Sequence, residues 1–262
     1  ALGGSYLAAV KEAPMLLVDA GDIMLTANYV INNSNGGATV YILGGPAAVP
    51  SSIENVLASA GMNVRRLAGN TRYETNIKVL DGAGVDGQDT LLVVNGNNYA
   101  DSLAASSTGA PILMVDGPAS ALMTEQRDWL PNHEFNEFVV LGGQGAVSSG
   151  IEGELTNSYA GGDANRVCRL AGGTRCETST LVADYFFGDT HEVTFAYAWD
   201  FPDGLSGGPV ANAVHAPVIL VADSPDDLNV VGQYIHSKTL DHVYVMGGTA
   251  RLSDAVITGL VG

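Results

Sequence analysis

An internal repeat is the feature that most limits what this chain can fold into. An apolar run that ends in a glycine pair occurs three times, and the first glycines of the pairs are 98 and 105 residues apart. These are Gly44, Gly142 and Gly247. An Ala-Pro step ahead of a second apolar run recurs at nearly the same period, at Pro14, Pro111 and Pro217. Landmarks repeated in register indicate tandem modules. We therefore predict three copies of one unit of about 100 residues, a common domain size.

A third motif, Arg-Leu-Ala-Gly followed by Thr-Arg-x-Glu-Thr, begins at Arg66 and again at Arg169. Together the landmarks predict modules at 1–69, 70–172 and 173–262. Asp203 precedes Pro217 by 14 residues, and the matching position of the first copy would fall just before Ala1. We therefore expect a piece of a longer protein, which lacks the front of the first module and the last strand of the third.

Within the middle copy, short apolar runs alternate with segments of helical pattern. The predicted strands are 91–95, 111–115, 138–141 and 166–170, and the predicted helices are 100–108, 123–130, 148–159 and 174–187. Strands that are apolar throughout and alternate with helices indicate parallel sheets covered on both faces. The sequence thus predicts an α/β fold with mostly parallel sheets.

The composition excludes several classes of protein. The net charge is −17, with 11 basic against 28 acidic residues, which disfavours a nucleic-acid binder because such proteins carry a basic face. The hydrophobic fraction of 46% disfavours disorder. Apolar runs are strand-length, well short of the ~20 residues of a membrane span, so we expect none.

The arginines gather at the repeated motif. Six of the eight lie in or beside it, namely Arg65, Arg66, Arg72, Arg166, Arg169 and Arg175. A guanidinium offers a planar fork of donors that suits phosphate or carboxylate oxygens. Each motif predicts a glycine turn and then a helix that starts near Thr71 or Thr174, whose first N–H groups could help to hold an anion. The alternative is that Arg72 and Arg175 form internal ion pairs with Glu74, Glu177 or a nearby Asp.

Asp101 and Asp203 follow an aromatic residue and precede a helix. An Asp there is a natural N-cap, so capping or pairing with the motif arginine stands beside ligand binding as an interpretation. The glycine pairs lack the Gly-x-Gly-x-x-Gly spacing of a dinucleotide site, and tight turning explains them.

A search for catalytic and metal-binding patterns finds little. The five histidines occupy unrelated positions of the repeat, and no nucleophile elbow or paired Cys/His set is present. The acidic residues between 223 and 227 read as a solvated loop without the spacing of an EF-hand. We predict no catalytic residue, no metal and no cofactor.

The motifs as an ordered set resemble the type 2 cell-wall-binding repeats of Gram-positive surface and S-layer proteins. The matching stretches are Arg-Leu-Ala-Gly-x-x-Arg-Tyr-Glu-Thr, Asn-Gly-x-x-Tyr-Ala-Asp-Ser-Leu, Ala-Pro-Ile-Leu and Leu-Gly-Gly-x-x-Ala-Val-Ser, and the resemblance covers essentially the whole chain. It implies three Rossmann-like modules in a pseudo-threefold arrangement. It also implies a secreted, non-enzymatic region that is anchored to an anionic secondary wall polymer, with other surface-layer proteins as further partners.

On this resemblance, the predicted polymer-binding residues are Arg66, Arg72, Arg169, Arg175, Glu74, Glu177, Asp101, Asp203 and Asn95. The copies depart from one another, so equivalent sites are not expected in all three. The second motif has Cys176 in place of an aromatic residue, and the middle copy leaves only 10 residues between Asp101 and Pro111, which predicts a first helix about one turn shorter. The third copy has Tyr197-Ala198 where the second has Asn-Gly.

Two other functions stay open at this point. One is a wall hydrolase or transferase that uses the clefts at strand ends. The other is an assembly scaffold in a surface layer or adhesin.

The two cysteines, Cys168 and Cys176, occupy the positions of Arg65 and Tyr73 in the preceding motif. They flank a tight turn, and the oxidising exterior would permit a disulfide. Two independent thiols are the alternative.

Overall fold

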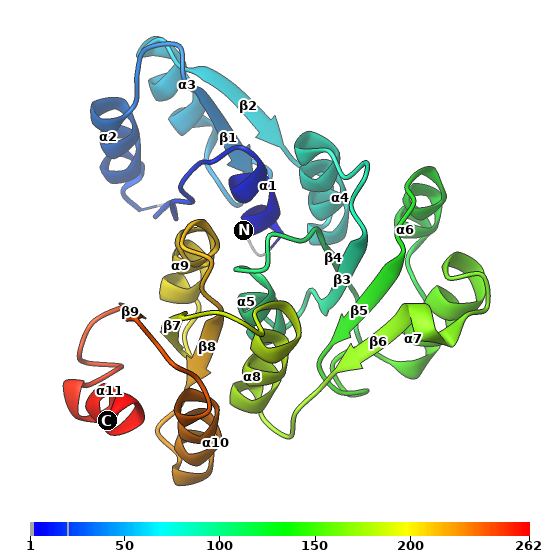
Figure 1. Cartoon of the computed structure of the whole chain (residues 1–262). Helices are drawn as coiled ribbons and strands as arrows, with labels where there is room; N and C mark the ends of the chain where they lie inside the picture. Colours follow the sequence, from blue (N-terminus) through cyan, green and yellow to red (C-terminus); the bar gives the residue numbers. More distant parts are fainter. Residues whose placement is uncertain (1–2, 20) are drawn as a thin grey trace.

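The structure is a computed structural model that describes residues 3–19 and 21–262, without the side chains of residues 100–102. The described strands form three sheets that follow one another along the chain (Figure 1). Their strand orders are β1-β2, β4-β3-β5-β6 and β8-β7-β9. All of the pairings are parallel, which confirms the predicted α/β class.

The elements alternate as predicted. The first are α1 (Gly4–Val10), α2 (Ile23–Asn33), β1 (Thr39–Leu43), α3 (Ser51–Ser59), β2 (Asn63–Leu67) and α4 (Arg72–Ala83). Next come β3 (Thr90–Asn95), α5 (Ala100–Ala105), β4 (Ile112–Val115), α6 (Thr124–Trp129), η1 (Leu130–Asn132), β5 (Glu137–Leu141), α7 (Ser149–Glu154), the π-helical η2 (Leu155–Tyr159), η3 (Ala164–Arg166) and β6 (Val167–Leu170). The last are α8 (Arg175–Phe186), β7 (Glu192–Tyr197), α9 (Pro202–Ala213), β8 (Val218–Val221), α10 (Pro225–His236), β9 (His242–Met246) and α11 (Asp254–Val261).

The second sheet has every strand of the repeat and a core on each face. Alternate residues of β3 enter different clusters: Leu91 and Val93 pack with α4, α6 and α7, whereas Leu92 and Val94 pack with α5 and α8. After β3 the chain forms β4 on one side of it and then returns to form β5 on the other. This reversal leaves the carboxyl ends of β3 and β5 flanking a crevice, where open α/β sheets commonly bind ligands.

The helix that follows each Arg-Leu-Ala-Gly strand leaves its own sheet and packs on the edge strand of the next. In α4, the buried Asn76 donates to the carbonyl of Ile112 and accepts from the N–H of Met114, both in β4. In α8, the equivalent Ser179 accepts from the N–H of Leu220 in β8. These bonds satisfy backbone groups of the edge strands β4 and β8, and so join the helix that follows one sheet to the next sheet.

The first helix of each copy lies at the centre of the molecule (Figure 1). There α9 packs against both α1 and α5, so the three equivalent helices meet as the predicted pseudo-threefold arrangement requires. Small residues allow the close approach, because a Cβ at Gly208 would lie 2.2 Å from the Ser106 hydroxyl. Helix α5 has 6 residues and α9 has 12, so the predicted shortening is confirmed and is nearer two turns than one.

The first and third sheets contain fewer strands. In the described part of the chain, β1 and β2 correspond to β5 and β6 of the second sheet, and the third sheet has no counterpart of β6. The predicted module boundaries at 69 and 172 fall in the turns after β2 and β6 and stay a prediction. Among the described helices, none has the length and apolar character needed to cross a membrane.

Of the two alternatives for Cys168 and Cys176, the structure shows the independent thiols, since both are free. Cys168 lies in β6 close to Glu137 and Glu152, whereas the buried thiol of Cys176 contacts Asp227 and the backbone of Ala222. The two sulfurs therefore face different surroundings, although only a short turn separates them along the chain.

Candidate functional site at the module junctions

The first arginine of each motif is held within its own sheet. Arg66 donates to the Gly44 carbonyl at 2.5 Å and pairs with Glu54 at 2.9 Å. Arg169 repeats both contacts, with the Gly142 carbonyl at 2.6 Å and Glu152 at 2.8 Å. These side chains are only 14% and 15% exposed, so each secures the glycine-pair turn of its own module. The sequence analysis did not single out the two glutamates, although their spacing of 98 residues equals that of the glycines.

The second arginine of each motif instead bonds to a strand-end turn of the next sheet, on which its helix packs. Arg72 donates from the start of α4 to the carbonyl of Gly96, just after β3, at 2.7 Å. Arg175 donates from the start of α8 to the carbonyl of Ala198, just after β7, also at 2.7 Å. Among the described side chains, no carboxylate forms an ion pair with either one. The interpretation that pairs these arginines with Glu74 or Glu177 is therefore wrong, whereas pairing with Asp101 lies outside the described side chains.

Glu74 and Glu177 close the turns that precede these helices. Glu74 accepts from the N–H of Asn70 at 2.8 Å, and Glu177 accepts from the N–H of Gly173 at 2.6 Å. Thr71 and Thr174 cap α4 and α8 by accepting from the N–H groups of the same glutamates, which confirms the predicted helix starts. Glu74 and Glu177 thus occupy some of the backbone N–H groups that were expected to hold an anion. Anion binding at these turns therefore depends more on the arginines.

The predicted aspartates and Asn95 have other positions than expected. Asp203 is the second residue of α9 rather than its N-cap, and its carboxylate lies beside Gly247, where a Cβ would come within 2.3 Å of an oxygen. Asp101 is likewise the second residue of α5, and its side chain lies outside the described part of the chain. Asn95 is buried and accepts from the N–H of Asn97 at 2.9 Å, which shapes the turn after β3.

A polar pocket of about 170 Å³ opens at the crevice of the second sheet. Its lining comes from the ends of β3, β5 and β6 and from the start of α8, and Arg175 is the charged residue in it. The other lining residues are Asn98, Gly142, Gly143, Ala146, Gly172 and Thr178. Arg175 thus contacts both the third sheet, through Ala198, and the strand-end pocket of the second sheet, as a ligand site between two sheets requires.

The first junction, where the helix that follows the first sheet meets the second sheet, is a polar network. The Tyr73 hydroxyl donates to the Asn97 side chain at 3.2 Å, and Asn97 in turn donates to Asp116 at 2.8 Å. Burial and the charge of Asp116 raise the pKa of Tyr73, so the phenol stays neutral. A polar ligand at this junction would meet amide and hydroxyl groups beside Arg72.

The junction between the second and third copies has different chemistry. Cys176 stands where the first junction has Tyr73, and burial, followed by the charge of Asp227, raises the pKa of its thiol to about 12. Trp199 takes the place of Asn97, and the guanidinium of Arg175 lies 4.0 Å from the centre of its ring. Here the arginine is surrounded by aromatic rings rather than by amides.

Asp227 was expected in a solvated loop, which is wrong. It lies in the first turn of α10 and is 7% exposed, with the Ser224 hydroxyl donating to its carboxylate at 2.6 Å. Burial alone would raise the pKa of Asp227, but Ser224, weaker contacts from Thr174 and Cys176 and the charge of Arg175 hold it below its usual value. The Ser-x-x-Asp spacing after a buried strand was the signal for this capping pair.

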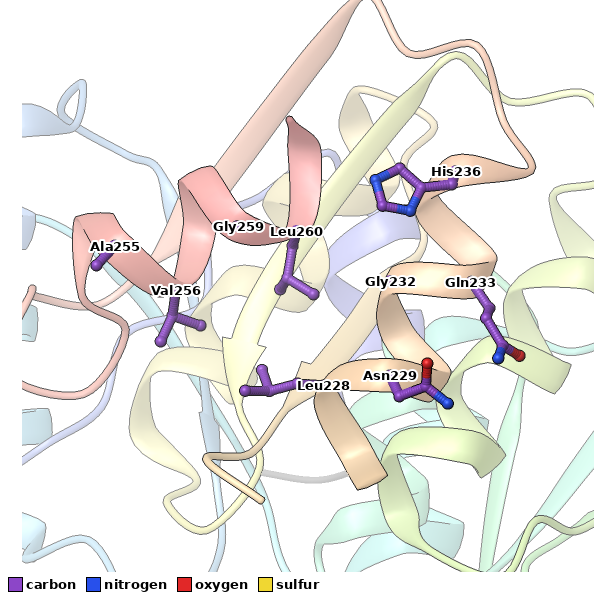
Figure 2. Close-up of a pocket in the computed structure, with 9 residues that line it drawn as sticks. All are labelled: Leu228, Asn229, Gly232, Gln233, His236, Ala255, Val256, Gly259 and Leu260. Atoms are coloured by element: carbon purple, nitrogen blue, oxygen red, sulfur yellow. The ribbon is translucent and has the colours of Figure 1, made fainter. Parts of the chain in front are cut away.

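A larger groove of about 530 Å³ lies between α10 and α11 (Figure 2). Leu228, Val256 and Leu260 line it, and no lysine or arginine is among its lining residues. This groove therefore does not suit an anion. Among the described residues, no three His, Cys, Asp or Glu side chains are grouped closely enough to hold a metal ion.

Comparisons with known proteins agree with this layout. The chain is 24% identical over 265 residues to N-acetylmuramoyl-L-alanine amidase LytC of Bacillus subtilis, and it spans 99% of its own length but only 50% of that protein. Its fold is similar to that of Cwp6 from Clostridium difficile (TM-score 0.86, 22% identity, 99% of this chain and 41% of that one). It is also similar to Cwp8 from the same organism (TM-score 0.80, 24% identity, 99% and 45%).

The family model described as cell wall binding domain 2 (CWB2) matches residues 1–54, 66–152 and 169–257. Each match covers most of one copy of the repeat. The third sheet lies within the third match, whereas β2 and β6, the last strands of the first two sheets, each start between two matches and end in the following one. The chain therefore belongs to the cell wall binding domain 2 family.

Proposed function

We propose that this region attaches its protein non-covalently to an anionic polymer of the Gram-positive cell wall, outside the cell. The observation that carries the proposal is the repeated bridge made by the second motif arginine. Arg72 and Arg175 make the same bond, at the same length, to a strand-end turn of the next sheet, and Arg175 also lines the strand-end pocket of the second sheet. Of the nine predicted polymer-binding residues, these two are assigned the direct contact, and the other seven are assigned the shaping of the site.

The electrostatics of the arginines support this division. Arg66 and Arg169 have carboxylate partners, so their charges are compensated within the fold. Arg72 and Arg175 bond to neutral carbonyls and form no ion pair with a described carboxylate, so their guanidinium groups stay available to a ligand while Arg175 also acts on nearby Asp227. Screening over about 8 Å at physiological salt lets such local charges act although the whole chain carries −17.

We propose further that the region is non-enzymatic. The amidase named among its relatives is about twice as long as the part that this chain matches, which leaves room for catalysis elsewhere in that protein. Among the described side chains, the two carboxyl groups with displaced pKa values, those of Glu154 and Asp227, support this assignment. Both values are lowered, whereas a general acid needs a raised one.

Sedimentation with purified Gram-positive walls tests the proposal. One sample of walls keeps its anionic polymer, and a matched sample is stripped of phosphate-linked polymer with hydrofluoric acid. We expect the protein to pellet with the intact walls, less so as salt is raised, and to stay in solution with the stripped walls. Equal binding to both samples would exclude an anionic polymer as the ligand.

A further inference from the structure

Two aromatic residues, Tyr99 and Trp199, lie against Arg175 at the second junction, and a third, Phe201, packs on Tyr99. Tyr99 precedes α5 in the second copy, whereas Trp199 and Phe201 come from the turn between β7 and α9 in the third. We call Tyr99, Trp199 and Phe201 the aromatic platform. Its members come from two modules, so the platform exists only where these modules meet.

Specific contacts hold the platform together. The Tyr99 hydroxyl donates to the Trp199 carbonyl at 3.0 Å, and the Tyr99 and Phe201 rings lie 5.6 Å apart between centres. The Arg175 guanidinium lies 4.0 Å from the centre of the Trp199 ring and 5.8 Å from that of Tyr99. A cation over an indole is attracted to the electron-rich face, so Arg175 orients the Trp199 ring, while the Tyr99 bond holds the Trp199 backbone.

The platform is open to solvent in spite of this order. Trp199 is 57% exposed and Phe201 is 44% exposed, whereas Trp129 is 6% exposed in the core of the second module. Exposed aromatic surface costs free energy in water, because apolar area there is left unburied. Rings that are oriented by specific contacts and still face solvent are typical of a surface that packs on a ligand.

The surroundings decide which ligand fits. Arg175 contacts the platform on one side and the polar pocket of the second sheet on the other. A ligand that covers both must present an apolar face to the rings and an acidic group to the guanidinium. Sugar rings have such a face, formed by axial C–H groups, and these C–H groups are attracted to the negative face of an aromatic ring.

We propose that the aromatic platform binds a sugar ring of the wall polymer, with the ring stacked on Trp199 and an acidic substituent or phosphodiester on Arg175. This proposal rests on the proposed function and narrows it, because the ligand is then an acidic glycan and not a ring-free polyol phosphate. The first junction has Asn97 in place of Trp199 and lacks the platform. It therefore binds the acidic group without selecting for a ring.

Two soluble anionic polymers separate the platform from the charge. Phosphomannan contains pyranose rings, whereas poly(glycerol phosphate) contains none. The 262-residue protein is titrated with each polymer, and binding is followed by calorimetry and by tryptophan fluorescence. Since Trp129 is buried, a change in emission on binding reports Trp199. The variants are W199A, the conservative W199F, R175A, and Y29A as a control, because Tyr29 is 55% exposed on α2.

We expect W199A to weaken phosphomannan binding about tenfold, an effect of the size seen when an aromatic stacking partner is removed. Poly(glycerol phosphate) binding should be unchanged in W199A, and W199F should restore most of the phosphomannan affinity. Y29A should bind both polymers as the wild type does, and thermal melting checks that each variant is folded.

The outcomes separate the two proposals. Equal affinity of W199A and wild type for phosphomannan overturns the proposal that the platform binds a sugar ring. Weaker binding of both polymers by R175A would still support the anionic-polymer function. If W199A weakens only phosphomannan binding and R175A changes neither affinity, the sugar-ring site is supported and the contact between Arg175 and the acidic group is contradicted. Self-association of the wild type that W199A abolishes would make the platform a contact between copies of the chain, and this result also overturns it.

Discussion

The two arginines of each repeated motif differ in their partners although they are only six residues apart. The first is tied to a glutamate and to the glycine-pair turn of its own module. The second extends to a carbonyl at a strand end of the next sheet. A guanidinium that is compensated inside the fold stabilises the fold, whereas one that bonds to a neutral carbonyl keeps its charge for a ligand. Substitutions at the two positions should therefore separate stability from binding.

Replacing Arg169 with Ala should lower the free energy of unfolding by about 3 kcal/mol, because Glu152 and the carbonyls of Gly142 and Val147 lose their shared partner in a mostly buried setting. Urea denaturation measures the change. R127A, which removes a 46% exposed arginine, is the control and should cost much less. An R169A variant as stable as the wild type would refute the internal role of this arginine.

The pKa of Asp227 predicts a pH-dependent effect. Because this pKa is lowered in the folded state, the charged carboxylate stabilises the fold above the unfolded value near 4, and this contribution is lost as the pH falls through the folded value. We expect D227N to be less stable than the wild type by about 1–2 kcal/mol at pH 7, with the difference shrinking below about pH 4. A difference that stays constant from pH 7 to pH 3 would contradict this origin.

The two thiols should differ in reactivity. Burial raises the pKa of both, for Cys176 to about 12, and Cys176 is fully buried while Cys168 is partly exposed. We expect a thiol reagent at pH 8 to label Cys168 first and Cys176 only when the protein unfolds. Intact mass with and without reductant should be identical. A 2 Da difference would show the bridge that the structure lacks.

At the scale of elements, the helices that follow the Arg-Leu-Ala-Gly strands hold the modules together. The Asn76 side chain bonds to both a carbonyl and an N–H of β4, and the Ser179 hydroxyl bonds to one N–H of β8. Each side chain replaces part of a missing neighbouring strand. The edges that they cover are buried, so their backbone groups have no access to water as a substitute.

Removing these side chains should therefore destabilise the fold in proportion to the bonds lost. We expect N76A to lower the free energy of unfolding by about 3 kcal/mol and S179A by about 1.5 kcal/mol, because two buried backbone groups lose their partner in one case and one in the other. Guanidinium denaturation provides the comparison. If S179A is the more damaging change, the two helices do not have equivalent roles.

Most elements of the middle copy could be predicted from the sequence, because its strands are short apolar runs between helices with clear starts. Thr71 and Thr174, for instance, cap their helices as predicted. The errors concern partners that are distant along the chain. Asp203 lies beside Gly247, and Asp227 is buried against residues at the start of α8. The local sequence pattern encodes neither contact. The aromatic platform also joins residues about 100 positions apart, so only the folded chain brings it together.

For the whole molecule, the repeat explains the fold and its divergence explains the sites. Three equivalent helices meet at the centre, and the same arginine bridge joins successive sheets twice. Around that bridge, one junction carries Tyr73 and Asn97, and the other carries Cys176 and Trp199. One architecture thus presents two different surfaces to a polymer that could span both, and two linked weak contacts give a stronger attachment than either alone.

Binding of the R72A/R175A double variant to purified anionic wall polymer tests whether Arg72 and Arg175 hold the polymer. The wild type, the double variant and R127A are compared at the same salt concentration, after thermal melting has shown that each is folded. We predict that the double variant binds at least about tenfold more weakly, because both junctions lose their guanidinium and the attachment loses its two-site character. R127A should bind as the wild type does. Unchanged binding by R72A/R175A would contradict the account.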